Sequence, residues 1–298
     1  MARIVFFGTP EIAVKPLLDL LEAGHDITLV VTRSDTRRGR GMKPSSSPVK
    51  RVAQEHGIRV TDHIEDVIDV DAEIGVVVAF GRIIPAHILR TIPMINIHFS
   101  LLPRWRGAAP VERAILAGDS VTGVCIMAVS EELDRGDVFA SCEINIDDSD
   151  NLSALSSRLI DLGSSMLVSL LKGGVEGLPT PIPQVGSASY ANKISVADLE
   201  INWQHSTAAI FRTILLERSW TLFRGKRLHI INAIEGNEPH AEVSNFAPGM
   251  IIFTDQKLLV RTGDSWLELL EVRPEGKNQM RASDWARGAR VDPGEGLG

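Results

Sequence analysis

Short apolar runs alternate with helical patterns along the first part of the chain. The run Arg3–Phe7 predicts a buried strand, apolar positions at helical spacing follow from Ile12 to Leu21, and Ile27–Thr32 predicts a second strand. A strand, a helix and a strand within about thirty residues form a βαβ unit, which implies parallel pairing. The apolar run Ile74–Ala79 predicts a buried central strand of the same sheet.

The same alternation continues further along the chain. Met94–Ile97 predicts a strand and Pro110–Ala117 a helix, and the runs Gly123–Val129 and Val138–Ile146 are rich in β-forming residues. Leu152–Lys172 has apolar residues at helical spacing and predicts a long amphipathic helix. Together these segments predict an α/β domain with a doubly wound, mostly parallel sheet.

The pattern changes in the second part of the chain. Residues 177–186 contain three prolines and two glycines, which predicts an extended crossing segment. A helix is expected from Ser206 to about Leu216, followed by short β-like runs at Trp220–Phe223, Arg227–Asn232, Gly249–Phe253, Leu258–Thr262 and Trp266–Val272. Several short strands at this spacing predict a small, OB-like β-barrel. We therefore predict an α/β domain at 1–189, a linker at 190–205 and the barrel domain at 206–298, with a frayed tail from Val291.

Composition limits the class of protein. The chain has 298 residues, of which 44 % are hydrophobic, so each predicted domain can form a core. No unbroken apolar stretch approaches 18 residues and the first apolar run is too short for a signal peptide, so we expect a cytosolic protein without a membrane span. Cys125 and Cys142 are predicted to be reduced core or near-core residues. The eight histidines do not cluster at ligand spacing, so we expect no metal.

Charge is distributed unevenly along the chain. The net charge is −7, which argues against a protein that coats nucleic acid indiscriminately. Between Arg33 and Arg51, however, there are seven basic residues and one acid, Asp35, and so a net charge of +6. This long segment, rich in glycine, proline and serine, is either a solvated surface loop or a contact for phosphates.

Asn96 and His98 are the first candidates for chemistry. Two positions apart at the end of a strand, their side chains share one face of the sheet. An amide donor beside an imidazole suits a reacting carbonyl, because the amide stabilises the developing oxyanion and the imidazole moves a proton. The alternative is a polar strand end with two solvated side chains.

The residues that follow resemble a known family. Asn-x-His-x-Ser-Leu-Leu-Pro, followed by Arg-Trp-Arg-Gly-Ala-Ala-Pro, is similar to the signature of the folate-dependent formyltransferases, and Leu133-Asp134-x-Gly136 matches the family's later Leu-Asp-x-Gly loop. The resemblance implies transfer of a formyl group from 10-formyltetrahydrofolate, a co-substrate, to an amine. It implies that Asn96 stabilises the oxyanion and that His98 either donates to the same oxygen or passes a proton to the leaving folate nitrogen. It also implies that Asp134 pairs with His98 and takes the amine proton through water.

The resemblance also implies folate contacts at two turns. They are Phe80, Gly81, Arg82 and Ile83 after one predicted strand, and Ser100, Leu101, Leu102 and Pro103 after the next. Each turn can equally be an ordinary strand-to-helix connection. Glu131, Glu132 and Asp137 flank Asp134 and are alternatives to it.

The sequence of the basic segment indicates which molecule accepts the formyl group. Its ending, Pro48-Val49-Lys50 after a Gly-Arg-Gly, resembles the loop of the family members that formylate a tRNA. The implied acceptor is the methionine amine of initiator methionyl-tRNA, contacted by Arg37, Arg38, Arg40, Lys43 and Lys50. The C-terminal domain is expected to extend this contact through Arg224, Lys226, Arg227 and His229, unless these line a solvated strand face. We expect a monomer.

Several assignments remain open at this stage. Arg104 and Arg106 can meet the folate tail, meet the tRNA end or serve the fold, while Trp105 suits packing. Phe99 stands where the family has a small residue or proline and can narrow the pocket. A serine hydrolase is disfavoured because Ser100 has no Gly-x-Ser-x-Gly elbow. The rival functions are formylation of a small amine and tRNA binding without catalysis.

Overall fold

The structure is a computed structural model that describes residues 1–37, 44–239 and 245–298. These residues form two compact units. The first comprises Met1–Val111, Val121–Asn145 and Ala154–Asn192, and the second comprises Glu112–Ser120, Ile146–Ser153 and Lys193–Gly298. Residues 190–205, which we expected to form a linker, are therefore divided between the units.

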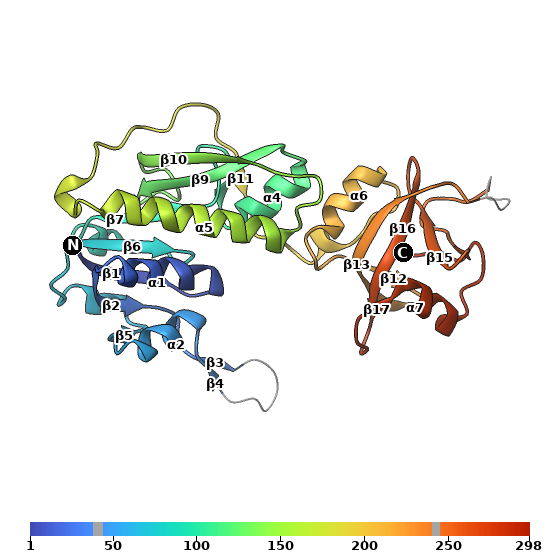
Figure 1. Cartoon of the computed structure of the whole chain (residues 1–298), viewed down its shortest axis with the longest axis horizontal. Coiled ribbons are helices and arrows are strands. Elements are labelled where there is room, and N and C mark those ends of the chain that lie inside the picture. Colours follow the sequence, from blue (N-terminus) through green and yellow to red (C-terminus); the bar gives the residue numbers. More distant parts are fainter. Residues whose placement is uncertain (38–43, 240–244) are drawn as a thin grey trace. The chain divides into compact units, whose positions relative to one another are not determined.

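A seven-stranded sheet forms the centre of the first unit (Figure 1). Its order is β10-β9-β7-β6-β1-β2-β5, in which β7, β6, β1, β2 and β5 run parallel while β9 is antiparallel to both of its neighbours. The strands are β1 (Arg3–Gly8), β2 (Asp26–Val31), β5 (Val60–Thr61), β6 (Ile74–Val78), β7 (Met94–His98), β9 (Val121–Ala128) and β10 (Val138–Asn145). Near-continuous apolar runs form the parallel strands because both of their faces are buried.

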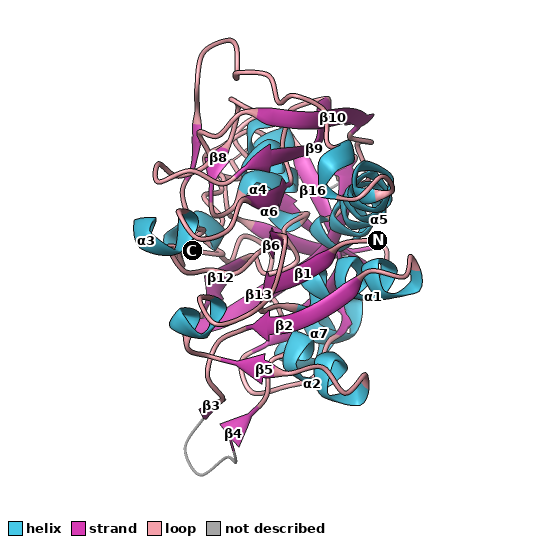
Figure 2. Cartoon of the chain, turned by 90° about the vertical axis from the view of Figure 1, so that its left-hand side faces the viewer, coloured by secondary structure: helices cyan, strands magenta, loops and turns pink. Residues whose placement is uncertain are grey.

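Helices cover both faces of this sheet (Figure 2). On one face lie α1 (Val14–Glu22) and α5 (Leu152–Leu171). On the other face, η2 (Ile64–Val67) and α3 (Ala86–Leu89) contribute to an apolar cluster with strand residues such as Phe7 and Val77. The other helical segments of this unit are η1 (Glu11–Ala13), α2 (Pro48–Glu55) and η3 (Val175–Gly177), while most of α4 (Pro110–Ala117) belongs to the second unit. The doubly wound α/β architecture is confirmed.

The second unit contains an antiparallel sheet of order β12-β13-β16-β15-β14, with β17 paired to β16. Its strands are β12 (Trp220–Phe223), β13 (Lys226–Gly236), β14 (Ile251–Thr254), β15 (Lys257–Arg261), β16 (Trp266–Pro274) and β17 (Met280–Arg281), and its helices are η4 (Ala197–Leu199), α6 (Thr207–Ile214) and α7 (Ala282–Ala289). Alternating inward residues of these strands pack with both α helices in one core. The predicted smaller β domain is confirmed.

The end of the chain corrects one expectation. The tail from Val291 does not fray, because Leu297 is buried and its N–H donates to the Gly249 carbonyl at 2.8 Å. Helix α7 was not predicted, although Ala282, Trp285 and Ala286 have the spacing of one buried helical face. Polar residues around these three positions obscured the pattern.

Two short strand pairs also lie outside the sequence expectations. β8 (Arg106–Gly107) pairs in parallel with β11 (Tyr190–Ala191), which joins two segments 84 residues apart in the chain. β3 (Thr36–Arg37) pairs with β4 (Pro44–Ser45) within the basic segment. The intervening residues 38–43 lie outside the described residues.

Helix α5 is long and apolar enough to pass a length-and-composition test for a membrane span. Six of its residues are buried, including Leu155, Leu159 and Leu167, and its Gly163 lies against the sheet strands β7 and β9. A core helix passes the same test, and these contacts are those of a core helix.

Phe99 points to this helix and not into the candidate site. A Cβ at Gly163 would lie 2.9 Å from Ile97 Cγ2 and 3.6 Å from Phe99 Cε1, so Ile97 and Phe99 face α5. Successive residues of an extended strand alternate between faces, which places His98 on the opposite side. The expectation that Phe99 can narrow the pocket is therefore wrong.

We predict opposite effects for the same substitution in two helices. Gly163→Ala should lower the free energy of unfolding by about 1–2 kcal/mol, because the overpacking exceeds the gain in helix propensity. Gly288→Ala in α7 should raise it by up to about 1 kcal/mol, because a Cβ there meets nothing within 4 Å. Urea titrations followed by circular dichroism test this, and equal stabilisation by both variants would contradict the packing described.

A second prediction concerns Asp198 and pH. Its carboxylate accepts hydrogen bonds from the Arg113 guanidinium, at 3.0 Å, and from the N–H and hydroxyl of Ser195, which together lower the pKa of Asp198 to about 2. Because the folded pKa lies below the unfolded one, the stabilisation is present above about pH 4 and is lost as the pH falls through 2. Asp198→Asn should therefore cost about 1–2 kcal/mol at pH 7. The difference from the native chain should shrink towards pH 2 in the same urea titrations, and a constant difference would refute it.

Candidate active site

Strand β7 presents the predicted pair at the carboxyl edge of the parallel strands. Asn96 pairs with Val77 of β6 and Met127 of β9, and His98 ends the strand beside Cys125. The two-residue spacing places both side chains on one face, as predicted. His98 is buried while Asn96 is partly exposed, so the amide remains accessible from solvent. Ligands of open α/β sheets bind at this edge.

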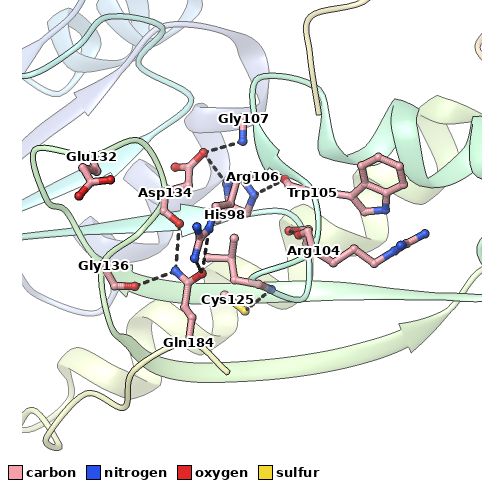
Figure 3. A network of polar contacts seen from close by, with 12 residues as sticks. His98, Arg104, Trp105, Arg106, Gly107, Cys125, Glu132, Asp134, Gly136 and Gln184 are labelled. Carbon is pink, nitrogen blue, oxygen red and sulfur yellow. Dashed lines mark hydrogen bonds and ion pairs between the residues drawn. The ribbon is translucent and has the colours of Figure 1, made fainter. Parts of the chain in front are cut away.

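The His98 imidazole has two polar neighbours (Figure 3). Its Nε2 lies 2.9 Å from the carbonyl oxygen of Trp105, and its Nδ1 lies 3.7 Å from Asp134 Oδ2. A carbonyl can only accept, so Nε2 carries a hydrogen and Nδ1 is the atom that gains or loses a proton. The separation of 3.7 Å between Nδ1 and Oδ2 is longer than a direct hydrogen bond.

Asp134 is held by a backbone donor. Its Oδ2 accepts a hydrogen bond from the Gly107 N–H at 2.8 Å, and 11 % of its side chain is exposed. Its φ of 51° lies in the left-handed region, which is uncommon for a residue other than glycine. The predicted pairing of Asp134 with His98 is thus present as a close electrostatic contact.

The flanking acids are placed differently. Glu132 pairs with Arg135, and Glu131 lies 3.9 Å from Arg90, and both acids are exposed. Asp137 accepts a hydrogen bond from the Ala128 N–H through its backbone carbonyl. Among these four acids, all within the described residues, Asp134 is the one in contact with His98.

The loop that carries Asp134 must fold back to reach His98. Because β9 is antiparallel to β7, its last residue Ala128 lies beside Ile95, whereas His98 lies beside Cys125. Three residues of strand separate these points, a distance of about 10 Å. Gly136 permits the return, because a Cβ there would lie 1.8 Å from the Ala128 carbonyl oxygen.

The turn after His98 is closed by internal hydrogen bonds. The Ser100 hydroxyl donates to the Arg104 carbonyl at 2.6 Å, and the Leu102 N–H donates to Cys125 Sγ at 3.4 Å. The Leu102–Pro103 peptide bond is cis. Because Ser100 is fully buried and its hydroxyl is engaged, it is unsuited to nucleophilic catalysis.

The Phe80–Ile83 turn follows β6, next to the end of β7. The Phe80 ring is buried edge-on against Phe7, at 5.4 Å between centroids, and Gly81 has a φ of 75°. Arg82 donates to the Asp62 carbonyl, and the Ile83 side chain is 85 % exposed. An exposed apolar side chain beside the site suits a flat heterocycle, and the predicted folate contacts at both turns stay a prediction.

Arg106 contacts the Asp134 loop indirectly, through Gln184. It is 8 % exposed, and its Nε and Nη2 donate to Gln184 Oε1 at 3.1 and 2.6 Å. Gln184 in turn donates to the carbonyls of Asp134 and Gly136. The Arg104 guanidinium instead lies over the Trp105 ring, 4.6 Å from its centroid. Sequence reasoning missed Gln184, because nothing in its Pro-rich segment marks it.

Part of the basic segment lies outside the described residues. Arg38, Arg40 and Lys43 lie outside the described residues, and Arg37 is described only through the backbone of β3. Lys50 Nζ lies 2.9 Å from Asp35 Oδ1, so its charge is partly neutralised. The predicted contacts of these five residues with tRNA remain untested predictions.

Cysteine and metal chemistry are not evident. Cys125 and Cys142 are both free, and burial raises the pKa of the Cys125 thiol. Cys142 is exposed on β10, so the expectation of a near-core position is wrong for it. Within the described ranges, no group of three or more His, Cys, Asp or Glu side chains could hold a metal ion.

The arrangement suits acyl transfer to an amine. Asn96 and His98 share one face of β7, the Asp134 carboxylate lies beside His98, and the Ser100 hydroxyl next to them is engaged by the Arg104 carbonyl. Two family models match this chain: "Formyl transferase" over residues 2–171, and "Formyl transferase, C-terminal domain" over residues 193–290. The chain belongs to the formyl transferase family. The resemblance seen in the sequence is confirmed.

Curated relatives of the family match nearly the whole chain. The methionyl-tRNA formyltransferase of Corynebacterium diphtheriae is 38 % identical over 98 % of this chain and 98 % of its own length. That of Heliobacterium modesticaldum is 39 % identical, with 98 % of each chain covered. A solved N-formyltransferase from Helicobacter canadensis, in complex with folinic acid and dTDP-3-aminofucose, has a TM-score of 0.68 at 18 % identity, covering 90 % of this chain and 98 % of that one. At that identity the structure shows a shared fold.

We predict that Asp134 and its neighbour Asp137 differ in their effect on formyl transfer. Asp134→Asn keeps the size of the side chain and an acceptor for the Gly107 N–H but removes the charge beside His98. It should lower the rate of formyl transfer by about 10²–10⁴-fold. Asp137→Asn should change the rate by less than about threefold, because this residue contributes its backbone to the loop. Single-turnover rates decide this, and an equal loss in both variants would contradict the assignment.

Proposed function

We propose that this protein transfers the formyl group of 10-formyltetrahydrofolate to the methionine amine of initiator methionyl-tRNA, in the cytosol and as a monomer. The observation that carries the proposal is the near full-length similarity to methionyl-tRNA formyltransferases. The site supports it, because Asn96 and His98 lie at the end of β7 and the Asp134 carboxylate lies 3.7 Å from the His98 imidazole.

The proposed reaction proceeds through one tetrahedral centre. The neutral methionine amine attacks the formyl carbon, a carbon–nitrogen bond forms, and the carbonyl electron pair moves to oxygen. The attacking nitrogen then loses a proton. As the bond to N10 of the folate breaks, N10 accepts a proton, so the proton count balances. The products are formylmethionyl-tRNA and tetrahydrofolate.

Each of the three side chains has a role that its position supports. The Asn96 amide donates to the developing oxyanion, an interaction worth roughly 3–4 kcal/mol in comparable enzymes. Asp134 accepts the amine proton, through water. His98 donates its Nδ1 proton to N10 and is then reprotonated from Asp134, through water because Oδ2 lies 3.7 Å away. The Trp105 carbonyl holds the ring in the orientation that presents Nδ1.

Folate is proposed to bind across the two neighbouring turns. Phe80–Ile83 and Ser100–Pro103 follow β6 and β7, which are adjacent parallel strands. Both turns therefore open at the same edge, beside His98. The exposed Ile83 offers an apolar surface for the pterin.

The tRNA is proposed to meet the basic segment first. Residues 33–51 leave the sheet after β2, at the same edge as the site and three strands from β7. With about 4.8 Å between strands, that root is roughly 15 Å from His98, within reach of an acceptor end. A charge of +6 in a chain of −7 gives the phosphates a localised attraction.

The second unit is proposed to extend the contact through Lys226 and Arg227. The Arg227 guanidinium lies 4.0 Å from the centre of the Trp220 ring, which holds it at the surface. Arg224 is already engaged by Glu295, and burial, followed by the nearby Arg273, lowers the pKa of His229. We therefore drop Arg224 and His229 from the proposed contact.

A small amine acceptor is the rival that deserves a test. The Helicobacter canadensis enzyme, solved with an amino sugar nucleotide, shares the fold of this chain. Such an acceptor would use the same three catalytic side chains but does not require a cationic segment.

We predict that the basic segment affects affinity and not chemistry. The triple variant Arg37→Ala, Arg38→Ala and Arg40→Ala should weaken tRNA binding by about 10–100-fold. It should also reduce the magnitude of the slope of log K against log salt concentration by roughly 2. At saturating tRNA the single-turnover rate should stay within about twofold of native. The measurement is formylation of charged initiator tRNA, combined with gel shifts at several salt concentrations.

The control removes the same charge elsewhere in the first unit. Arg3, Arg59 and Lys172 lie at the amino ends of β1 and β5 and at the end of α5, and changing all three to alanine should leave tRNA affinity nearly unchanged. An equal loss in both variants would indicate a general charge effect. Formylation of a small amine without formylation of tRNA would reject the proposed acceptor.

A further inference from the structure

We propose that Gln184 is a positioning residue that, held by Arg106, keeps the Asp134 carboxylate in register with His98. This inference rests on the proposed function, in which Asp134 takes the amine proton. It assigns a catalytic consequence to a side chain 50 residues away from Asp134 in the sequence.

The conformation of the loop that carries Asp134 needs contacts with residues outside the loop. Its root at Ala128 is about 10 Å from His98 along β7, and Glu131, Glu132, Leu133 and Arg135 are all exposed. Asp134 also adopts a left-handed φ of 51°, a conformation that persists in residues other than glycine when surrounding contacts impose it. The loop's own contacts, such as the pairing of Arg135 with Glu132, lie among exposed side chains, where hydrogen bonds and ion pairs contribute little.

Gln184 supplies the constraint through the backbone of the loop. Its Nε2 donates to the carbonyl oxygen of Asp134 at 2.9 Å and to that of Gly136 at 2.8 Å. A primary amide has two N–H donors, so each carbonyl takes one of them. Both sides of residue 135 are thereby fixed, and with them the direction of the Asp134 side chain (Figure 3).

Arg106 fixes the orientation of the Gln184 amide. Its Nε and Nη2 both donate to Gln184 Oε1, at 3.1 and 2.6 Å. A guanidinium has donors and no acceptor, so the amide oxygen must face Arg106 and the amide nitrogen must face the loop. Because Arg106 is 8 % exposed, water competes little for these hydrogen bonds.

The residues on either side of Arg106 contact the catalytic pair directly. The Trp105 carbonyl accepts from His98 Nε2, and the Gly107 N–H donates to Asp134 Oδ2. Three consecutive residues therefore locate the imidazole, the Gln184 amide and the carboxylate. A displacement of the loop by about 1 Å, at unchanged substrate binding, is enough to lower a proton-transfer rate by orders of magnitude.

Two substitutions of Gln184 separate this role from simple packing. Gln184→Met keeps the length of the side chain and removes all its hydrogen bonds. Gln184→Glu keeps an acceptor for Arg106 and gains charge pairing, but it directs oxygen at the carbonyls of Asp134 and Gly136. If Gln184 positions the loop, both variants should lose formylation rate. If Gln184 only provides a hydrogen-bond acceptor for Arg106, Gln184→Glu should keep the native rate.

The experiment measures single-turnover formylation at saturating folate and tRNA. Both variants should lose about 10–100-fold in rate, with the affinities for folate and tRNA within about threefold of native. Gln54→Met, at an exposed position of α2, is the matched control and should retain the native rate. A native rate for either Gln184 variant, or a loss confined to substrate affinity, would overturn the proposal.

A double variant tests whether Gln184 acts through Asp134. If it does, adding Gln184→Met to Asp134→Asn should slow the reaction by less than about threefold beyond Asp134→Asn alone. Multiplication of the two separate losses would show independent roles and reject the inference.

A crystal structure of Gln184→Met distinguishes failure of this inference from failure of the proposed function. If Gln184 positions the loop, Asp134 Oδ2 should move away from His98 Nδ1 in this variant and lose its hydrogen bond from the Gly107 N–H. If the native protein formylates no tRNA but the carboxylate moves in the variant, the proposed acceptor is wrong and the positioning role stands. An unmoved carboxylate rejects the positioning role whatever the substrate.

Discussion

The antiparallel direction of β9 beside β7 is the constraint on which the site depends. It places the root of the Asp134 loop next to the start of β7, whereas His98 stands at the end of that strand. The loop must fold back over the face that carries Asn96, and Gly136 makes room for this return. Every contact that holds Asp134 in place is a consequence of this geometry.

The segment 105–107 contacts both His98 and Asp134 and so brings them together. Its carbonyl at Trp105 orients His98, its N–H at Gly107 holds the Asp134 carboxylate, and the Arg106 side chain orients Gln184. The segment is itself anchored by the β8–β11 pair. A backbone segment that contacts both side chains at once couples their positions, which the proposed proton transfer between them requires.

Charge is distributed unevenly along this chain. The acidic balance of the whole protein limits non-specific attraction to nucleic acid, and the basic segment 33–51 is the part to which we assign the proposed tRNA contact. The proposed chemistry needs no such field, because His98 and Asp134 are close to one another and largely buried. The proposal therefore assigns the acceptor contact and the chemistry to different residues.

Local pattern determined much of this protein. The two-residue period of a strand put Asn96 and His98 on one face. The direction of Phe99, which packs against α5, became clear only from the structure. The motif around Asp134 singled out the acid of its loop that lies near His98. Tertiary structure alone decided how the loop returns to His98 and that Gln184 supports it, because these contacts join residues tens of positions apart. Periodicity reports on neighbours within one element, whereas such contacts depend on strand direction and order.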